Sequence, residues 1–277
     1  MAYTTIDNPE LHFQVKTYTA NQTNGTAITL DGDEDMSPNM CWWKNRDATY
    51  DHRIIDTVRG VTKILTPNTT SAEATNSDAL ASFDSDGFTV NADPAGYGLN
   101  YATGNGIVAW CWKAGTTSGI SGSPSITPSG YSFSQTAGFS IIAYTGNATV
   151  GATIPHGLGV APAVIIFKNR DSSVKWAVYH HKNTSAPETD HLQLNDDGGT
   201  SDDDSILNDT APSSSVITMK TSSSVNSSGH NFICYAFTSI KGFSKMGSYT
   251  GNGSTNGTFV YTGFKPAFVM IKRSSST

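Results

Sequence analysis

Charged residues are scarce in this chain of 277 residues. They make up 14% of it and leave a net charge of −6, whereas globular chains typically carry about 25%. Lysine and arginine form no cluster of the kind that phosphate binding requires, so nucleic acid is not expected as a partner. Stretches rich in leucine, lysine and glutamate are few, and long amphipathic helices are therefore not expected.

Export and membrane signals are also lacking. Residues 1–7 contain neither a basic region nor an apolar stretch, which predicts that no signal peptide is present. The longest apolar run, residues 160–167, is far too short to span a bilayer. We therefore expect synthesis in a cytoplasm, without insertion into a membrane.

Cysteine is limited to Cys41, Cys111 and Cys234. The odd number and the wide spacing fit neither a disulfide framework nor a metal-binding knuckle. All three lie in apolar, strand-like runs, so we interpret them as small hydrophobic residues of the core. No cofactor and no metal ligand are predicted, and residues that contact a ligand stay unknown at this point.

Motifs for catalysis are missing as well. The sequence has no Walker-type phosphate loop, no His-Glu-x-x-His and no Gly-x-Ser-x-Gly. A glycan depolymerase stays an alternative, because the fold and not the spacing brings its paired carboxylates together. Glu73 and Glu188, however, do not occupy matching points of the repeat described below. We predict that the chain is not an enzyme and assign no catalytic residue.

Acidic and histidine-containing stretches are candidates for cation sites. Residues 31–35 alternate aspartate as a calcium loop does, but Trp42 stands where the bidentate acid is required. The aspartates of residues 202–204 form a second acidic stretch. Both are interpreted as exposed turns, with a weak cation site as the alternative. His180 and His181 would face opposite sides of a strand, and they and His191 are interpreted as surface residues.

What the sequence does contain is an internal repeat. A Tyr-Thr-(Ala/Gly)-Asn stretch is followed by a proline and then by an apolar run that ends in lysine, always at the same distance from the proline. The tyrosines, prolines and lysines are Tyr18, Pro38 and Lys44, then Tyr144, Pro162 and Lys168, then Tyr249, Pro266 and Lys272. Three ordered landmarks in three copies are not expected by chance.

The first two copies also close alike. Residues 106–112 match residues 231–237, and in both stretches a bulky aromatic alternates with a small residue. Period two is the signature of a strand, and the apolar character of both faces predicts burial between two layers. Short strands between turn residues, such as the expected hairpin at residues 84–87, favour an all-β chain of tandem antiparallel β-sandwiches of the jelly-roll type. A short helix is expected over residues 71–80, capped by Ser71.

The copies define the predicted organisation of the chain. Residues 1–10 are an amino-terminal segment and a candidate for attachment to a larger assembly. Residues 11–115 and 137–241 are β-sandwich repeats, joined by a linker over residues 116–136 that is rich in Ser, Gly, Thr and Pro. Residues 242–277 are an incomplete third repeat without a closing strand. Two readings of that segment are open: it leads into further repeats, which we favour, or it packs on the second repeat or on a neighbouring chain.

Lys-Asn-Arg-Asp follows the apolar run in both complete copies, at residues 44–47 and 168–171. We expect each lysine to mark the point where its strand emerges into solvent. The stretch itself is interpreted as a structural turn in which Asp47 and Asp171 bond to nearby backbone amides or to the arginine. The alternative is a ligand-binding tip.

Several stretches resemble a family of tailed-bacteriophage virion proteins common in marine phages. They are residues 1–9, the Tyr-Thr-Gly-Asn and Lys-Asn-Arg-Asp stretches, and residues 56–60, 82–88 and 110–115. The resemblance covers nearly the whole chain and implies repeats of a concanavalin-like or SPRY-like sandwich. The second copy departs from the first, because it lacks the stretch of residues 83–88 and has Val-Lys-Trp at residues 174–176 where the first has Tyr-Asp-His.

The resemblance implies a structural protein of the virion, of the tail fibre or tail-associated type, that contributes to host attachment. The expected partners are other copies of the chain in a homotrimer, other proteins of the tail or capsid, and glycans of the host surface. A capsid decoration or head fibre protein is the alternative.

Overall fold

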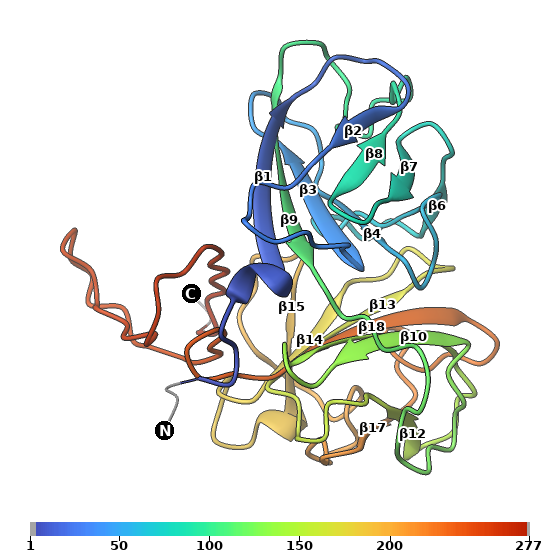
Figure 1. Cartoon of the computed structure of the whole chain (residues 1–277). Helices are drawn as coiled ribbons and strands as arrows, with labels where there is room; N and C mark the ends of the chain where they lie inside the picture. Colours follow the sequence, from blue (N-terminus) through green and yellow to red (C-terminus); the bar gives the residue numbers. More distant parts are fainter. Residues whose placement is uncertain (1–3, 276–277) are drawn as a thin grey trace.

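The chain folds almost entirely into β-structure. The computed structural model describes residues 4–275, which form several antiparallel sheets and two short 3-10 helices, η1 (Pro9–Leu11) and η2 (Pro187–Thr189) (Figure 1). The all-β expectation is confirmed. No helix within these residues is long and apolar enough to cross a membrane.

The first repeat contains one larger and one smaller sheet. The larger has the order β1 (Phe13–Thr19), β9 (Gly106–Trp112), β3 (Met40–Asn45) and β4 (Arg53–Asp56). The smaller consists of β2 (Thr26–Ile28), β8 (Phe88–Val90) and β7 (Leu80–Phe83), beside a two-stranded pair of β5 (Lys63–Ile64) and β6 (Ala74–Thr75). An apolar core that includes Trp43, Phe88 and Ile107 lies within this repeat.

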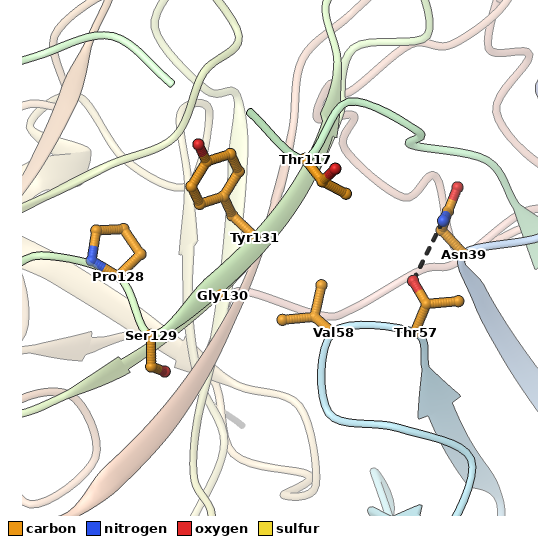
Figure 2. A pocket seen from close by; sticks show the side chains of 8 residues that line it. All are labelled: Asn39, Thr57, Val58, Thr117, Pro128, Ser129, Gly130 and Tyr131. Atoms are coloured by element: carbon orange, nitrogen blue, oxygen red, sulfur yellow. Dashed lines mark hydrogen bonds between the residues drawn. The ribbon is translucent and has the colours of Figure 1, made fainter. Parts of the chain in front are cut away.

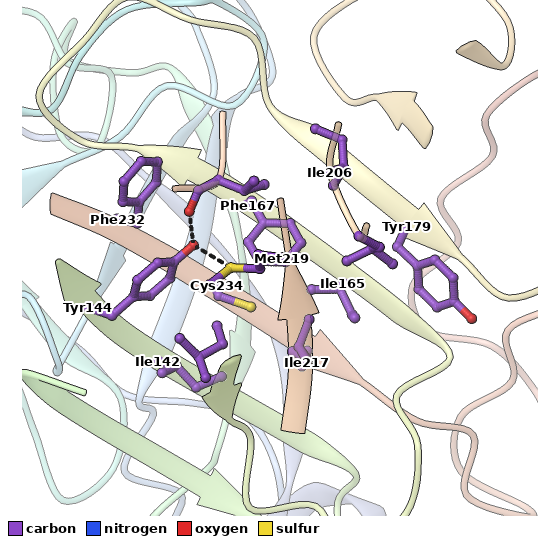
Figure 3. Packing of buried hydrophobic residues seen from close by; sticks show 14 of the residues in the cluster. Ile142, Tyr144, Ile165, Phe167, Tyr179, Ile206, Ile217, Met219, Phe232 and Cys234 are labelled. Carbon is purple, nitrogen blue, oxygen red and sulfur yellow. Dashed lines mark hydrogen bonds between the residues drawn. The ribbon is translucent and has the colours of Figure 1, made fainter. Parts of the chain in front are cut away.

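The second repeat is built on a seven-stranded sheet. Its order is β10 (Gly130–Ser134), β11 (Phe139–Thr145), β18 (Asn231–Phe237), β13 (Val164–Asn169), β14 (Ala177–His180), β15 (Asp190–Gln193) and β16 (Ser201–Asp202). A two-stranded sheet of β12 (Ala152–Pro155) and β17 (Val216–Met219) accompanies it. Figure 3 shows the core between them, where Ile142, Phe167 and Ile217 pack together.

The two repeats share their central topology. The order β1-β9-β3-β4 of the first corresponds to β11-β18-β13-β14 of the second. In both, the closing strand lies between the strand that carries the tyrosine motif and the strand that follows the proline. The register agrees as well, because Met40 pairs with Trp112 just as Val164 pairs with Phe237. The prediction of two equivalent closing strands is confirmed.

The tyrosine motif performs the same structural task in both repeats. Tyr18 donates its hydroxyl to the carbonyl of Leu99 at 2.6 Å, and Tyr144 donates to the carbonyl of Val225 at the same distance (Figure 3). In each case the acceptor lies 81 residues further along the chain. The next residue, Asn100 or Asn226, accepts a hydrogen bond from the backbone of the motif's own asparagine. The motif therefore anchors a distant loop to the first strand of each repeat.

Two local expectations differ from the structure. The helix expected over residues 71–80 does not form, and β6 and the start of β7 occupy that stretch. The segment assigned as linker, residues 116–136, contains β10, which extends the second sheet because Phe133 buries its ring there. All three cysteines are buried and free, as expected.

The carboxy-terminal segment carries the landmarks of a third copy without its strands. Residues 245–275 form no strand. Phe268 packs against Phe13, Trp110 and Trp112 of the first repeat, with ring centroids 5.3 to 6.3 Å apart. Its neighbour Val269 is 66% exposed, although the equivalent residues of the complete copies are fully buried. The segment also contacts the second repeat, because Lys272 donates to the carbonyl of Asp196 and the amide of Thr200 donates to the carbonyl of Ser274. It thus packs on both repeats, which agrees in part with the reading that places it on the second; the contact with the first was not expected.

Candidate functional site

The most elaborate arrangement of side chains in the molecule lies at the seam between the two repeats. The larger sheets meet there across a shared apolar core. The first repeat contributes Met40, Ile54 and Leu65, and the second contributes residues such as Phe139 and Ile166. Each sheet therefore covers a core of its own with one face and the seam with the other.

Arg59 is the centre of a charged network buried in this seam. Its side chain is fully buried, as is that of Asp56, to which it donates at 2.6 Å. Tyr235 of the second repeat donates its hydroxyl to the same carboxylate oxygen at 2.7 Å. A second carboxylate, Glu73, accepts from the guanidinium at 3.0 Å. The guanidinium also donates to the carbonyls of Ile54 and Lys63, so each of its three nitrogens has a hydrogen-bond partner.

The charges of the network stabilise one another. Burial lowers the pKa of Arg59, but the charge of Asp56, with Tyr235 and Glu73, outweighs it and raises the pKa above its ordinary value. Burial raises the pKa of Glu73, but the hydrogen bond from Arg170 and the charge of Arg59 hold it below its ordinary value. Both groups are therefore ionised at neutral pH. A buried ion pair is tolerated where every partner is satisfied in this way.

Arg170 completes the connection from the other side. It donates to both carboxylate oxygens of Glu73, at 2.8 Å each, in the bidentate geometry that suits guanidinium and carboxylate. The backbone amide of Glu73 donates to the carbonyl of Arg170 at 2.8 Å. The equivalent arginine of the first repeat, Arg46, is exposed to solvent. Glu73 is thus bound by Arg59 and Arg170 and is not placed as a free catalytic acid.

The Lys-Asn-Arg-Asp stretches are structural turns, as predicted. Asn45 and Asn169 each accept two backbone amides of the turn, at 3.0 to 3.1 Å. Asp47 accepts the amide of Gly106, and Asp171 accepts the amide of Asn231, at 2.5 and 2.7 Å. Each turn therefore holds the start of the closing strand of its repeat.

The lysines of these stretches do not emerge into solvent, which corrects the expectation. Lys168 is fully buried, and Lys44 is half-buried. Lys168 donates to the carbonyls of Thr70, Ser172 and Val174 at 2.7 to 3.3 Å, and burial lowers its pKa to about 8. Three carbonyls thus replace water around the ammonium group, and one of them belongs to the first repeat.

Residues 174–176, where the sequence of the second repeat differs from that of the first, also lie at the seam. Trp176 is fully buried and donates its indole N–H to the carbonyls of Thr66 and Thr69, both at 3.2 Å. The first repeat has His52 at the matching point, where it accepts a hydrogen bond from Trp42 of the same repeat. The difference between the copies therefore provides a contact between them.

An open cleft of about 510 Å³ lies on the surface of the seam (Figure 2). Asn39, Thr57 and Val58 line it from the first repeat. The other side is lined by Thr117 and residues 128–131, which belong to β10 and to the segment that the sequence predicted to be a linker. Asn39 donates to the hydroxyl of Thr57 at 3.2 Å (Figure 2). The cleft places an aromatic ring beside an amide and several hydroxyls.

The acidic and histidine stretches do not converge on a metal. Among residues 4–275, no group of three or more His, Cys, Asp or Glu side chains is placed to hold an ion. Asp31 pairs with Lys16, and Asp204 pairs with Lys220. His191 is buried rather than on the surface, because it lies in β15, and burial lowers its pKa. His180 and His181 are half-buried.

Sequence reasoning missed the seam network. In the sequence, residues 56–60 carry only a family resemblance, and Glu73 is an acid without a counterpart in the second copy.

The sequence profile of a family described as Domain of unknown function (DUF7483) matches residues 8–277. No curated protein and no solved structure matches the chain.

Proposed function

The chain belongs to the DUF7483 family, and we propose that it is a structural protein of a bacteriophage virion, of the tail fibre or tail-associated type. The observation that carries the proposal is the buried network around Arg59. It fixes two repeats to each other through charges, hydrogen bonds and a shared core. Such a joint suits a rigid element that transmits load. A flexible linker would serve a protein whose domains bind independently.

We also propose the finer fold as tandem antiparallel sandwiches of the jelly-roll, concanavalin-like or SPRY-like type. In support, each repeat has a larger and a smaller sheet beside a continuous apolar core. A solved structure of the chain, aligned with proteins of those classes, tests this. A strand order that matches none of them would contradict it.

Assembly with other chains is part of the proposal. Four apolar side chains of the carboxy-terminal segment are 66 to 85% exposed: Phe259, Tyr261, Val269 and Ile271. Exposed apolar residues gathered in one segment mark contact sites more often than isolated ones do. We expect a homotrimer, attached to other tail or capsid proteins. Mass photometry at micromolar concentration tests the trimer, and a monomer at every concentration contradicts it.

Contact with host glycans is the remaining part, and the cleft beside Tyr131 is its candidate location. A sugar has hydroxyl groups for Asn39 and Thr57 and an apolar ring face for the tyrosine. Binding of the purified chain to host surface polysaccharide, with and without Tyr131→Ala, tests this assignment. Equal binding by both proteins would remove the cleft from the proposal.

The deciding experiment locates the chain on the particle. Phage particles that encode it are purified, and cryo-electron microscopy with an antibody fragment against the chain marks its position. Density on the tail supports the proposal, whereas density on the shell selects the capsid decoration or head fibre alternative. Absence of the chain from purified particles, by mass spectrometry, would overturn both. Release of oligosaccharides from host polysaccharide would instead favour a depolymerase.

A further inference from the structure

Cys41 and Cys111 face each other across two central strands of the first repeat. Cys41 lies in β3 and Cys111 in β9, and the register of the two strands pairs them directly. Their sulfur atoms are 3.1 Å apart, and both residues are fully buried. Neither takes part in the seam or in the cleft.

The hydrogen-bond pattern of the strands decides whether such a pair can be bridged. Arg46 donates its amide to the carbonyl of Gly106, so these two residues form a hydrogen-bonded pair. Antiparallel pairs alternate between hydrogen-bonded and non-hydrogen-bonded. Counting five residues along each strand places Cys41 and Cys111 at a non-hydrogen-bonded pair, where Cα atoms are roughly 4.5 Å apart. That separation lies within the range of about 4.4–6.8 Å that disulfides span.

We propose that Cys41 and Cys111 form a cross-strand disulfide under oxidising conditions. This inference does not depend on the proposed function. The oxidant is a low-molecular-weight disulfide. One cysteine thiolate attacks it, forms a mixed disulfide and releases one small thiol. The second cysteine then attacks the sulfur of the first and releases the second small thiol, so the two cysteines lose two protons and two electrons in all.

Burial sets the kinetics of the reaction. Burial raises the pKa of the Cys41 thiol well above its ordinary value, so little thiolate is present in the folded state. The bond therefore forms during folding or when the strands open briefly. Once closed, it spans most of the first repeat and restricts its unfolded chain.

The second repeat supplies an internal control. At the matching pair it has Ile165 opposite Ala236, and its own cysteine, Cys234, lies opposite Phe167. Cys234 therefore has no thiol partner in the register, and it should stay free under the conditions that oxidise the other two.

The experiment refolds the full chain from denaturant in a buffer of reduced and oxidised glutathione, traps free thiols with an alkylating reagent and maps the peptides by mass spectrometry. We expect one linked pair of peptides that carries Cys41 and Cys111, with Cys234 alkylated. The thermal midpoint should exceed that of the reduced protein by about 5–10 °C. A Cys111→Ala variant should lose that difference, and Cys234→Ala should keep both the bond and the difference. Three alkylated cysteines after refolding, or a bond that includes Cys234, would overturn the proposal.

Discussion

Arg170 of the second repeat donates two hydrogen bonds of 2.8 Å to Glu73 of the first, although 97 residues separate them along the chain. Its counterpart in the first repeat, Arg46, is exposed. The two arginines follow the same lysine and asparagine in the same kind of turn. Comparing variants at these two arginines therefore measures how much the contact at the seam contributes to stability.

Replacing Arg170 by alanine is expected to lower the free energy of unfolding by about 1–2 kcal/mol, because Glu73 loses a bidentate partner at a site that is mostly shielded from water. Arg46→Ala is the matched control and should change it by less than about 0.5 kcal/mol. Denaturant titrations measure both values. Equal effects from the two variants would show that the ion pair does not stabilise the seam.

Arg59→Met removes the centre of the network. Asp56 then keeps only neutral partners while it stays fully buried, so we expect a loss of about 3–5 kcal/mol in the free energy of unfolding. The double change Arg59→Met with Asp56→Leu removes both buried charges and should recover part of that loss. If the double variant is less stable than the single one, the penalty does not come from an unpaired charge.

The tyrosine motif gives a prediction that compares the two repeats. Tyr144→Phe leaves the buried carbonyl of Val225 without its donor and should cost about 1–2 kcal/mol. Tyr18→Phe should cost a similar amount, because its hydroxyl holds the carbonyl of Leu99 at the same distance. Hydrogen exchange of residues 97–101 and 224–228 shows whether each loop is released. Release of the wrong loop, or of neither, would contradict the assigned role.

The stability of the second repeat should fall in mild acid because of His156. This side chain is fully buried, and burial lowers its pKa to about 4. Its Nδ1 accepts from the amide of Leu158, and its Nε2 lies 3.2 Å from the carbonyl of Ser213, an arrangement that the neutral ring satisfies with its proton on Nε2.

The direction of the effect follows from the two states. In the unfolded chain the histidine titrates near its ordinary value of about 6.5. Above that pH neither state is protonated and the stability is complete. As the pH falls towards 4 the unfolded state binds the proton first, so the free energy of unfolding drops by about 3 kcal/mol. Unfolding curves between pH 7 and pH 4 test this, and His156→Gln should have a shallower slope. An identical slope would assign the drop to other groups.

The carboxy-terminal segment is expected to detach when Phe268 is replaced by alanine, because its ring is the main apolar contact of the segment with Trp110 and Trp112. Trypsin should then cleave after Lys272 and Arg273 several times faster, and tryptophan fluorescence should shift to longer wavelength. Phe259→Ala is the control, since that ring is 85% exposed. Equal cleavage rates in the two variants would show that Phe268 does not hold the segment.

The sequence predicted the features that depend on periodicity. Alternating large and small residues at 106–112 and 231–237 identified both closing strands, and the turns at Asp47 and Asp171 bond as expected. What depends on distant partners could not be predicted. Lys168 looks like a residue at the end of a strand until the carbonyls around it are known. The helix propensity of residues 71–80 is overridden because Glu73 is held by two arginines and by the backbone of Arg170. Contacts of this kind, between residues far apart along the chain, cannot be predicted from one sequence.

The place of Tyr235 in the last strand has a consequence for synthesis on the ribosome. Asp56 and Arg59 are made early, but the hydroxyl that completes their network is made 179 residues after Asp56. At translation rates of about 5–20 residues per second, the interval lasts roughly 9–36 s. During this interval the charges of Asp56 and Arg59 lie on a surface of the first repeat that is still open to water, which can solvate them. Docking of the finished second repeat expels that water, so the joint closes only after Tyr235 has been made.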